Sequence, residues 1–235
     1  MENSARTAII TGGTGALGSV VIQKFALRGV NLALPVREAS SLDYIARSYP
    51  ANKLYVAVID LEDESSVASL VRQAVGKFGR IDHLVNIVGG YAGGSPIDKV
   101  TLEEWERMMD VNLRTAFLAC RAVLPVMRQH AYGRIVNIAA MPALMSGARK
   151  GPYAISKRAV ISLTETIADE TKGTGITANA LAPSIILTEA NKQSMPDADF
   201  SKWVTPEEIA DLILYVCSEE ARSVSGNVIK IYGGV

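Results

Sequence analysis

The chain has few of the features that mark several classes of protein. Its 235 residues carry 24 Lys and Arg against 24 Asp and Glu, so no net charge favours nucleic acid or an anionic surface. No apolar run approaches the ~18 residues of a membrane-spanning helix, and the first residues contain no apolar segment typical of a leader. These absences predict a soluble, cytoplasmic protein that acts on a small molecule, with no nucleic-acid or membrane partner.

Cysteine is also scarce. Cys120 and Cys217 both lie in apolar helical stretches and lack the spacing of metal ligands, so we expect buried free thiols and no metal site. Apolar residues, in contrast, make up 49% of the chain, which is enough for one sizeable core. We therefore expect residues 1–235 to form a single domain.

Short β-branched or apolar runs alternate with longer helical patterns, which is typical of βαβ units. The run Leu54-Tyr-Val-Ala-Val-Ile59 is almost continuously apolar, as expected for a strand covered by helices on both faces. The sequence predicts an α/β single-domain Rossmann fold, with a doubly wound parallel sheet. Its seven strands are predicted near residues 7–11, 30–36, 54–59, 81–88, 133–139, 176–182 and 227–232.

Two helix starts are well marked. Thr101 precedes Glu104 and Thr205 precedes Glu208 by three residues, the spacing of a capping box, and Pro206 suits a first helical position. The polar stretch 184–204 is the one long irregular connection that we expect, and long loops in compact domains are often binding loops. We predict that this loop borders the substrate.

A glycine-rich turn, Thr11-Gly-Gly-Thr-Gly-Ala-Leu-Gly18, joins the first predicted strand to the first predicted helix. Glycines let backbone N–H groups approach a pyrophosphate, and the helix N-terminus favours its negative charge. The turn predicts a dinucleotide site; a purely structural turn is the alternative.

The end of the second predicted strand indicates which dinucleotide is bound. NAD sites carry an acidic residue there for the ribose hydroxyls, whereas NADP sites supply an arginine for the 2′-phosphate. Here Val36 takes the acidic position and Arg37 follows it, which favours NADP(H) over NAD(H); a solvated surface arginine is the alternative. Asp60, just after the third strand, is placed to meet the adenine edge.

Tyr153 and Lys157 stand one helical turn apart in Gly-Pro-Tyr-Ala-Ile-Ser-Lys. A tyrosine hydroxyl has a reference pKa near 10, and a neighbouring cation lowers that value by stabilising the phenolate. The pair could therefore exchange a proton with a substrate, although an amphipathic helix also produces this spacing by chance.

Six motifs follow one another along the chain: the Thr-Gly turn, Asp60-Leu61, Asn86-x-x-Gly89, Asn112, Tyr153-x-x-x-Lys157, and Pro183 with Thr188. In this order they resemble the short-chain dehydrogenase/reductase family over essentially the whole chain. The resemblance implies that Tyr153 is the acid-base residue, that Lys157 holds the nicotinamide ribose and lowers the tyrosine pKa, and that Asn112 joins a water-linked proton relay. It also implies a homo-oligomer, a dimer or a tetramer. The cofactor contacts it implies are Gly12, Thr14, Gly15, Ala16, Leu17, Gly18, Arg37, Asp60, Leu61, Asn86, Val88, Gly89, Tyr153, Lys157, Pro183, Ile186 and Thr188.

One departure from the family pattern has a chemical meaning. Thirteen residues before the tyrosine, where the family has a serine that hydrogen-bonds the substrate carbonyl oxygen, this chain has Ala140. Losing one donor at a developing oxyanion typically costs ~10²–10³ in rate. Either the substrate is no ordinary ketone, or the activity is impaired, or water or Ser146 replaces the serine.

The dihydropteridine reductase branch of this family tolerates alanine at that position. Gly89-Gly-Tyr-Ala-Gly-Gly94 is similar to that branch's Gly-Gly-Trp-Ala-Gly-Gly, and the segment 191–203 is similar to its Asn-Arg-Lys-Ser-Met-Pro-Glu-Ala-Asp-Phe-Ser-Ser-Trp. Asn112 and the pair Val36-Arg37 depart from it. This resemblance favours an NADPH-dependent reductase of quinonoid dihydropterin or a similar planar substrate, with Tyr91, Ala140 and Met195 in the substrate pocket. A carbonyl or alcohol oxidoreductase, or a non-catalytic NADP-binding sensor, is the alternative.

Overall fold

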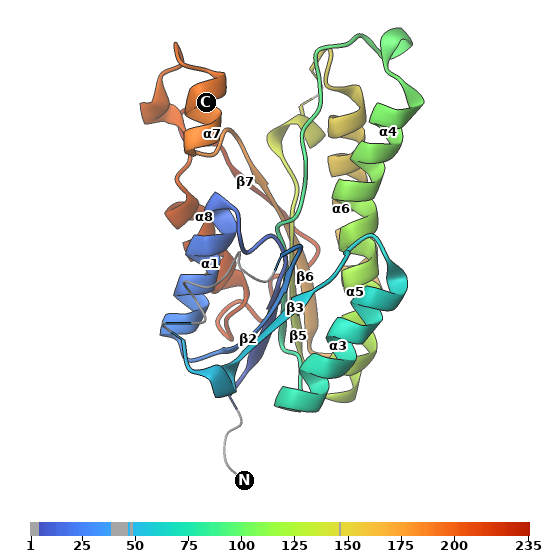
Figure 1. Ribbon diagram of the computed structural model, residues 1–235, viewed down its shortest axis with the longest axis vertical. Coiled ribbons are helices and arrows are strands. Elements are labelled where there is room, and N and C mark those ends of the chain that lie inside the picture. Colours follow the sequence, from blue (N-terminus) through green and yellow to red (C-terminus); the bar gives the residue numbers. More distant parts are fainter. Residues whose placement is uncertain (1–4, 39–46, 48, 146) are drawn as a thin grey trace.

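A computed structural model describes residues 5–38, 47, 49–145 and 147–235, and it has the predicted three-layer arrangement (Figure 1). Seven parallel strands form one sheet in the order β3-β2-β1-β4-β5-β6-β7, which confirms the predicted Rossmann fold. The strands are β1 (Thr7–Ile10), β2 (Asn31–Val36), β3 (Leu54–Val58), β4 (His83–Asn86), β5 (Gly133–Ile138), β6 (Ile176–Pro183) and β7 (Val228–Ile231).

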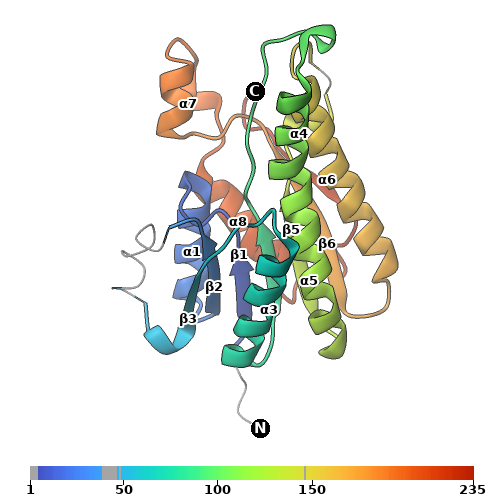
Figure 2. The same ribbon diagram turned by 45° about the vertical axis from the view of Figure 1, so that its right-hand side comes forward.

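Helices cover both faces of the sheet, so its central strands are buried and could be apolar throughout. One face carries α1 and α8, and the other carries α3, α5 and α6 (Figures 1 and 2). The α-helices are α1 (Ala16–Leu27), α3 (Glu64–Phe78), α4 (Leu102–Met109), α5 (Thr115–Gln129), α6 (Gly151–Glu170), α7 (Glu189–Ser194) and α8 (Pro206–Val216). Short 3-10 turns span η2 (Ala51–Lys53), η3 (Ile97–Lys99), η5 (Met141–Ala143) and η6 (Phe200–Lys202).

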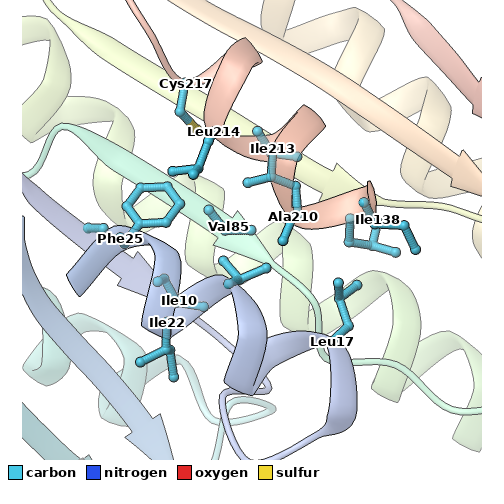
Figure 3. Close-up of a cluster of buried hydrophobic side chains, with 14 of the residues drawn as sticks. Ile10, Leu17, Ile22, Phe25, Val85, Ile138, Ala210, Ile213, Leu214 and Cys217 are labelled. Carbon is cyan, nitrogen blue, oxygen red and sulfur yellow. The ribbon is translucent and has the colours of Figure 1, made fainter. Parts of the chain in front are cut away.

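The core between the sheet and the pair α1 and α8 is built from interdigitated aliphatic side chains and one aromatic ring (Figure 3). Phe25 is 1% exposed on α1, and Ile213 is fully buried on α8. Burying such side chains is worth roughly 1.5–3 kcal/mol each. This packing fixes α1, and with it the glycine turn that precedes the helix.

Both predicted helix starts are confirmed. The Thr205 hydroxyl accepts a hydrogen bond from the Glu208 N–H, and the Glu208 carboxylate accepts one from the Thr205 N–H, so the capping box is complete. Thr101 accepts from the Glu104 N–H at 3.1 Å and caps α4. Local side-chain chemistry sets both boundaries.

The segment 184–204 is more regular than we predicted. It contains α7 and η6, because the Thr188 hydroxyl caps the first of these and the Asp199 carboxylate caps the second. Ile186 forms an isolated parallel bridge with Val204, which ties the two ends of the segment together. In Figure 2 α7 lies beyond the carboxyl ends of the strands, above α1.

The strand order reverses at β1, since β2 and β3 lie on one side of it and β4 on the other. In open α/β sheets ligands bind outside the carboxyl ends of the strands at this switch point. The glycine turn after β1 lies there. The fold therefore places the predicted dinucleotide turn at the expected crevice.

Candidate active site

The glycine turn brings backbone donors to the crevice. Gly15 is the N-cap of α1, and no side chain among the described residues caps this helix, so its first N–H groups remain available for an anion. At Gly18 a Cβ atom would lie 2.0 Å from the Gly12 carbonyl oxygen, so only glycine allows α1 to start so close to the turn. Thr11 fixes the turn to β4, because its hydroxyl accepts from the N–H groups of Ile87 and Val88 at 3.0 and 3.3 Å.

A cavity of about 470 Å³ opens over this turn. Its size suits a small-molecule or cofactor site. Thirteen of the predicted cofactor residues line it: Gly12, Thr14, Gly15, Ala16, Leu17, Gly18, Arg37, Asp60, Leu61, Val88, Gly89, Ile186 and Thr188. The structure thus gathers residues from five separate segments of the chain around one space.

The residues that indicate the nucleotide type lie at one part of this cavity. Val36 is buried at the end of β2, whereas Arg37 is exposed and lines the cavity. The Asp60 carboxylate accepts a hydrogen bond from the Glu62 N–H at 2.9 Å and shapes the turn after β3. A guanidinium rather than a carboxylate therefore follows β2.

Four predicted cofactor residues do not line the cavity: Tyr153, Lys157, Asn86 and Pro183. The last two belong to the strands β4 and β6. The Asn86 amide donates to Asn137 Oδ1 at 2.8 Å and bridges β4 to β5 inside the protein. Pro183 is the last residue of β6 and pairs with Ile231 of β7. In this structure both side chains support the strand ends that frame the site.

Tyr153 and Lys157 both lie on α6, and Lys157 is buried. Its ammonium donates to the Ile138 carbonyl oxygen at 2.8 Å. Burial lowers the pKa of Lys157 to about 8 and raises the pKa of Tyr153 to about 12, with Tyr91 raising the latter further. The predicted lowering of the tyrosine pKa by the lysine is therefore wrong for the cofactor-free protein, because loss of hydration dominates and the ammonium serves the Ile138 carbonyl.

Asn112 sits in η4 (Asp110–Arg114), a π-helical segment between α4 and α5 that turns this side chain inward. Its amide group donates to the Gly90 carbonyl oxygen at 3.1 Å and to Ser156 Oγ at 3.0 Å, and its Oδ1 accepts from the Gly90 N–H at 2.9 Å. A Cβ atom on Gly89 would lie 2.7 Å from Asn112 Oδ1 and 2.9 Å from Lys157 Nζ. Asn112 and Lys157 thus converge on Gly89, and π-bulges of this kind are frequent at functional sites.

Two phenols lie side by side where the substrate is expected. The Tyr91 ring lies 5.0 Å from the Tyr153 ring, centroid to centroid, at an interplanar angle of 76°. Tyr91 is 59% exposed, while Ala140 is buried and offers no donor. Met195 follows α7 and is half-buried. Ser146, the suggested substitute for the missing serine, lies outside the described residues.

Sequence reasoning missed several residues around the cavity. Thr11 was visible in the Thr-Gly turn but its role as an acceptor depends on the distant strand β4. Asn191 lines the cavity and donates to the Ile186 carbonyl oxygen at 2.8 Å, and the Thr188 cap three residues earlier could have indicated it. Other lining residues without a sequence motif are Pro35, Ile59, Glu62, Ile87, Val111 and Thr115.

Comparison with known proteins shows the family to which the chain belongs. The chain matches the family described as short chain dehydrogenase over residues 6–199. It is 31% identical to 2-(R)-hydroxypropyl-CoM dehydrogenase of Xanthobacter autotrophicus, covering 97% of this chain and 98% of that protein. It is 29% identical to 3-oxoacyl-[acyl-carrier-protein] reductase of Thermotoga maritima, covering 100% and 99%. A solved structure described as ElxO with NADP bound matches with a TM-score of 0.90 at 26% identity, covering 98% of both chains.

The chain therefore belongs to the short-chain dehydrogenase family. It is a nicotinamide-dependent oxidoreductase of the dehydrogenase and ketoreductase kind. No helix among the residues that the structure describes is both long and apolar enough to cross a membrane.

Proposed function

We propose that this protein interconverts a carbonyl group and an alcohol, with Tyr153 as the proton donor in the reductive direction. The observation that carries the proposal is the placement of Tyr153 and Lys157 one turn apart on α6, with the Lys157 ammonium at the Ile138 carbonyl oxygen at the carboxyl end of β5. The named relatives support it, since their names describe a hydroxyalkyl dehydrogenase and an oxoacyl reductase. A carbonyl or alcohol substrate therefore takes precedence over the dihydropterin that the sequence favoured.

The described residues fit a nicotinamide dinucleotide. The uncapped N-terminus of α1 would hold the pyrophosphate, and Arg37 would hold a 2′-phosphate. Lys157 and Thr188 would lie toward the nicotinamide half. When bound, this group supplies or accepts the hydride.

Tyr153 suits proton donation because its phenol stays protonated across the neutral range, where its pKa of about 12 keeps it in the acid form. In reduction, the carbonyl carbon receives hydride and the carbonyl oxygen receives the phenolic proton, which yields the alcohol. The reverse reaction needs the phenolate, and burial disfavours that form.

Lys157 keeps the nearby backbone in place and contributes positive charge below its pKa of about 8. Among the described residues its ammonium donates one hydrogen bond, to the Ile138 carbonyl oxygen, and an ammonium carries three donors. Its other donors could meet a ribose hydroxyl or stabilise a phenolate. Asn112 donates hydrogen bonds to Gly90 and Ser156 and so holds these two residues in position near Lys157.

NADPH is the cofactor that we propose, on the strength of Arg37 at the cavity and the absence of a carboxylate at Val36. The NADP-bound relative is consistent with this preference. The two nucleotides differ only at the 2′-position. The guanidinium of Arg37 is the feature that would separate their affinities.

A second candidate substrate is a quinonoid dihydropterin or a similar planar conjugated ring. Ala140 favours it, because hydride addition to such a ring creates no alkoxide for a serine to stabilise. The exposed ring of Tyr91 beside Tyr153 could stack on a flat substrate. Both substrates use the same proton donor, so the choice between them is experimental.

A substrate and cofactor panel tests the proposal. Purified protein is assayed with a 3-oxoacyl thioester, a cyclic diketone and a quinonoid dihydropterin, each with NADPH and with NADH. We expect NADPH-dependent reduction of one of the two ketones. Reduction of the dihydropterin alone would instead establish the second candidate. Tight NADPH binding without any turnover would overturn both and favour a cofactor-binding sensor.

A further inference from the structure

A second cavity, of about 290 Å³, lies far from the cofactor cleft, at the amino ends of the strands. It is bounded by the residue before β1, the first residue of β4, the residue before β5 and the C-terminal ends of α1 and α8. In Figure 1 this is the lower end of the sheet, opposite α7. The lining includes Arg6, Arg28, His83, Tyr132, Ser218 and Glu219.

Unpartnered polar atoms gather at this cavity. Of the seven buried side-chain nitrogen and oxygen atoms without a hydrogen-bond partner among the described residues, four belong to residues that line it. They are Arg6 Nη1, His83 Nδ1, the Tyr132 hydroxyl and Ser218 Oγ. Buried polar groups are almost always paired, and each exception costs roughly 1–3 kcal/mol. Four exceptions around one space indicate a missing polar partner.

The side chains around the cavity are held in place by the fold. His83 is 4% exposed, and its ring makes edge contacts with Phe25 at 5.6 Å and with Tyr132 at 6.3 Å. The guanidinium groups of Arg6 and Arg134 lie over the Tyr132 ring, 3.9 and 4.3 Å from its centroid. This arrangement is built before any ligand arrives, as specific sites require.

The charge of the cavity favours an anion. Arg6 and Arg28 line it, and Arg134 stands behind Tyr132. Glu219 is the one carboxylate among the described lining residues, and it already pairs with Arg6 and Arg134. Burial, with smaller contributions from Arg6, Arg134 and Arg80, lowers the pKa of His83 to about 3, so the imidazole is neutral at neutral pH.

The remaining wall of the cavity is apolar. Phe25, Leu214 and Cys217 lie together in the core cluster of Figure 3, and each also lines the cavity. The space thus has a donor-rich end and a hydrophobic wall. A volume near 290 Å³ has room for an oxyanion with a short organic body.

We propose that this cavity is a second ligand site, which binds a small organic anion with a carboxylate or phosphate head group. The head group would accept hydrogen bonds from Arg6, Arg28, Ser218 and the neutral His83, and the organic body would pack on Phe25 and Leu214. The site is separate from the cofactor cleft and does not depend on the proposed reaction.

Histidine NMR tests the proposal directly, because the chain has only two histidines. His83 lies at the cavity, and His130 is exposed at the end of α5, so the second serves as an internal reference. Protein labelled with ¹³C and ¹⁵N at histidine is titrated with hexanoate, with phenyl phosphate and with the neutral analogue hexanol. Each titration is repeated in the presence of saturating NADPH.

We expect hexanoate or phenyl phosphate to shift the His83 resonances saturably, with or without NADPH, and which of the two binds more tightly identifies the head group. Hexanol should not shift them. Arg28→Gln or Ser218→Ala should weaken binding about tenfold, as expected for a lost hydrogen bond to a charged group, whereas the surface variant Arg72→Gln should not. The proposal is overturned if neither anion shifts His83, if His130 responds equally, or if NADPH abolishes the effect.

Discussion

The rings of Tyr91 and Tyr153 meet at 76° with their centroids 5.0 Å apart. After burial, Tyr91 is the second cause that raises the pKa of Tyr153. Because Ala140 cannot donate, these two hydroxyl groups are the polar groups that we expect a substrate oxygen to meet. The relationship makes Tyr91 a candidate for the role that serine has in the family.

Replacing Tyr91 with phenylalanine keeps the ring contact and removes only the hydroxyl. If Tyr91 donates to a carbonyl substrate, kcat/KM for a ketone should fall about tenfold in Tyr91→Phe, the cost of one hydrogen bond to developing charge. Steady-state kinetics with NADPH measures the change. Affinity for NADPH, followed by fluorescence, should stay the same. Unchanged ketone reduction in Tyr91→Phe would show that Tyr91 contributes only its ring.

Restoring the missing donor should raise ketone reduction. Ala140 is 5% exposed at the end of the segment that follows β5, and Ala140→Ser adds one hydroxyl there. We expect an increase of about tenfold or more in kcat for a ketone, since such donors are worth ~10²–10³ where they are optimally placed. Ala139→Ser, at the preceding buried position, is the matched control. No response in Ala140→Ser, or an equal response in the control, would count against the carbonyl reaction.

Cofactor preference should depend on Arg37. Arg37→Gln keeps a polar side chain at the cavity and removes the charge that we expect on the 2′-phosphate. The dissociation constant for NADPH should rise about tenfold to a hundredfold, while that for NADH stays nearly constant. Arg72→Gln, an exposed arginine on α3, controls for net charge. Equal losses for both nucleotides would place Arg37 outside the phosphate site.

We expect the buried Lys157 side chain to lower the free energy of unfolding of the cofactor-free protein. Its folded pKa of about 8 lies below the 10.5 of an ordinary lysine, so the unfolded chain holds an extra proton between these two pH values. The stability contributed by this group therefore rises with pH across that window. At pH 7, Lys157→Met should therefore be more stable by roughly 2 kcal/mol.

Urea unfolding at pH 7 and pH 10 measures this difference. The advantage of Lys157→Met over the wild type should shrink at pH 10, because both then bury a neutral side chain. Lys230→Met, at an exposed position of β7, should show no such change. A destabilised Lys157→Met protein at pH 7 would mean that the bond to the Ile138 carbonyl oxygen outweighs the cost of burial.

Much of the fold followed from local patterns. The apolar run Leu54 to Ile59 correctly predicted a parallel strand, and Thr205 with Glu208 predicted a helix start, because each depends on neighbours in the chain. The burial predicted for that strand is wrong, because β3 lies at the sheet edge, where Val58 is 57% exposed. The helix α7 was missed because it is a single short helix whose only local mark is the Thr188 cap.

The site was predicted less completely, because its properties arise from contacts between distant segments. The sequence places Lys157 one turn from Tyr153, but the Ile138 carbonyl that receives the ammonium lies on β5. Burial then raises the tyrosine pKa, opposite to the effect expected from two neighbours in the sequence. Likewise, Asn86 matches the family motif, yet its side-chain amide donates a hydrogen bond to Asn137 and does not line the cavity.

The central claim is that Tyr153 delivers the proton during reduction. The most direct test is the single-turnover rate of NADPH oxidation by Tyr153→Phe with the best substrate from the panel, measured beside NADPH affinity. We predict a loss of ~10²–10⁴ in rate, as for removal of a general acid, with NADPH binding unchanged within about twofold. A Tyr153→Phe protein that binds NADPH normally and reduces the substrate at the wild-type rate would contradict the account.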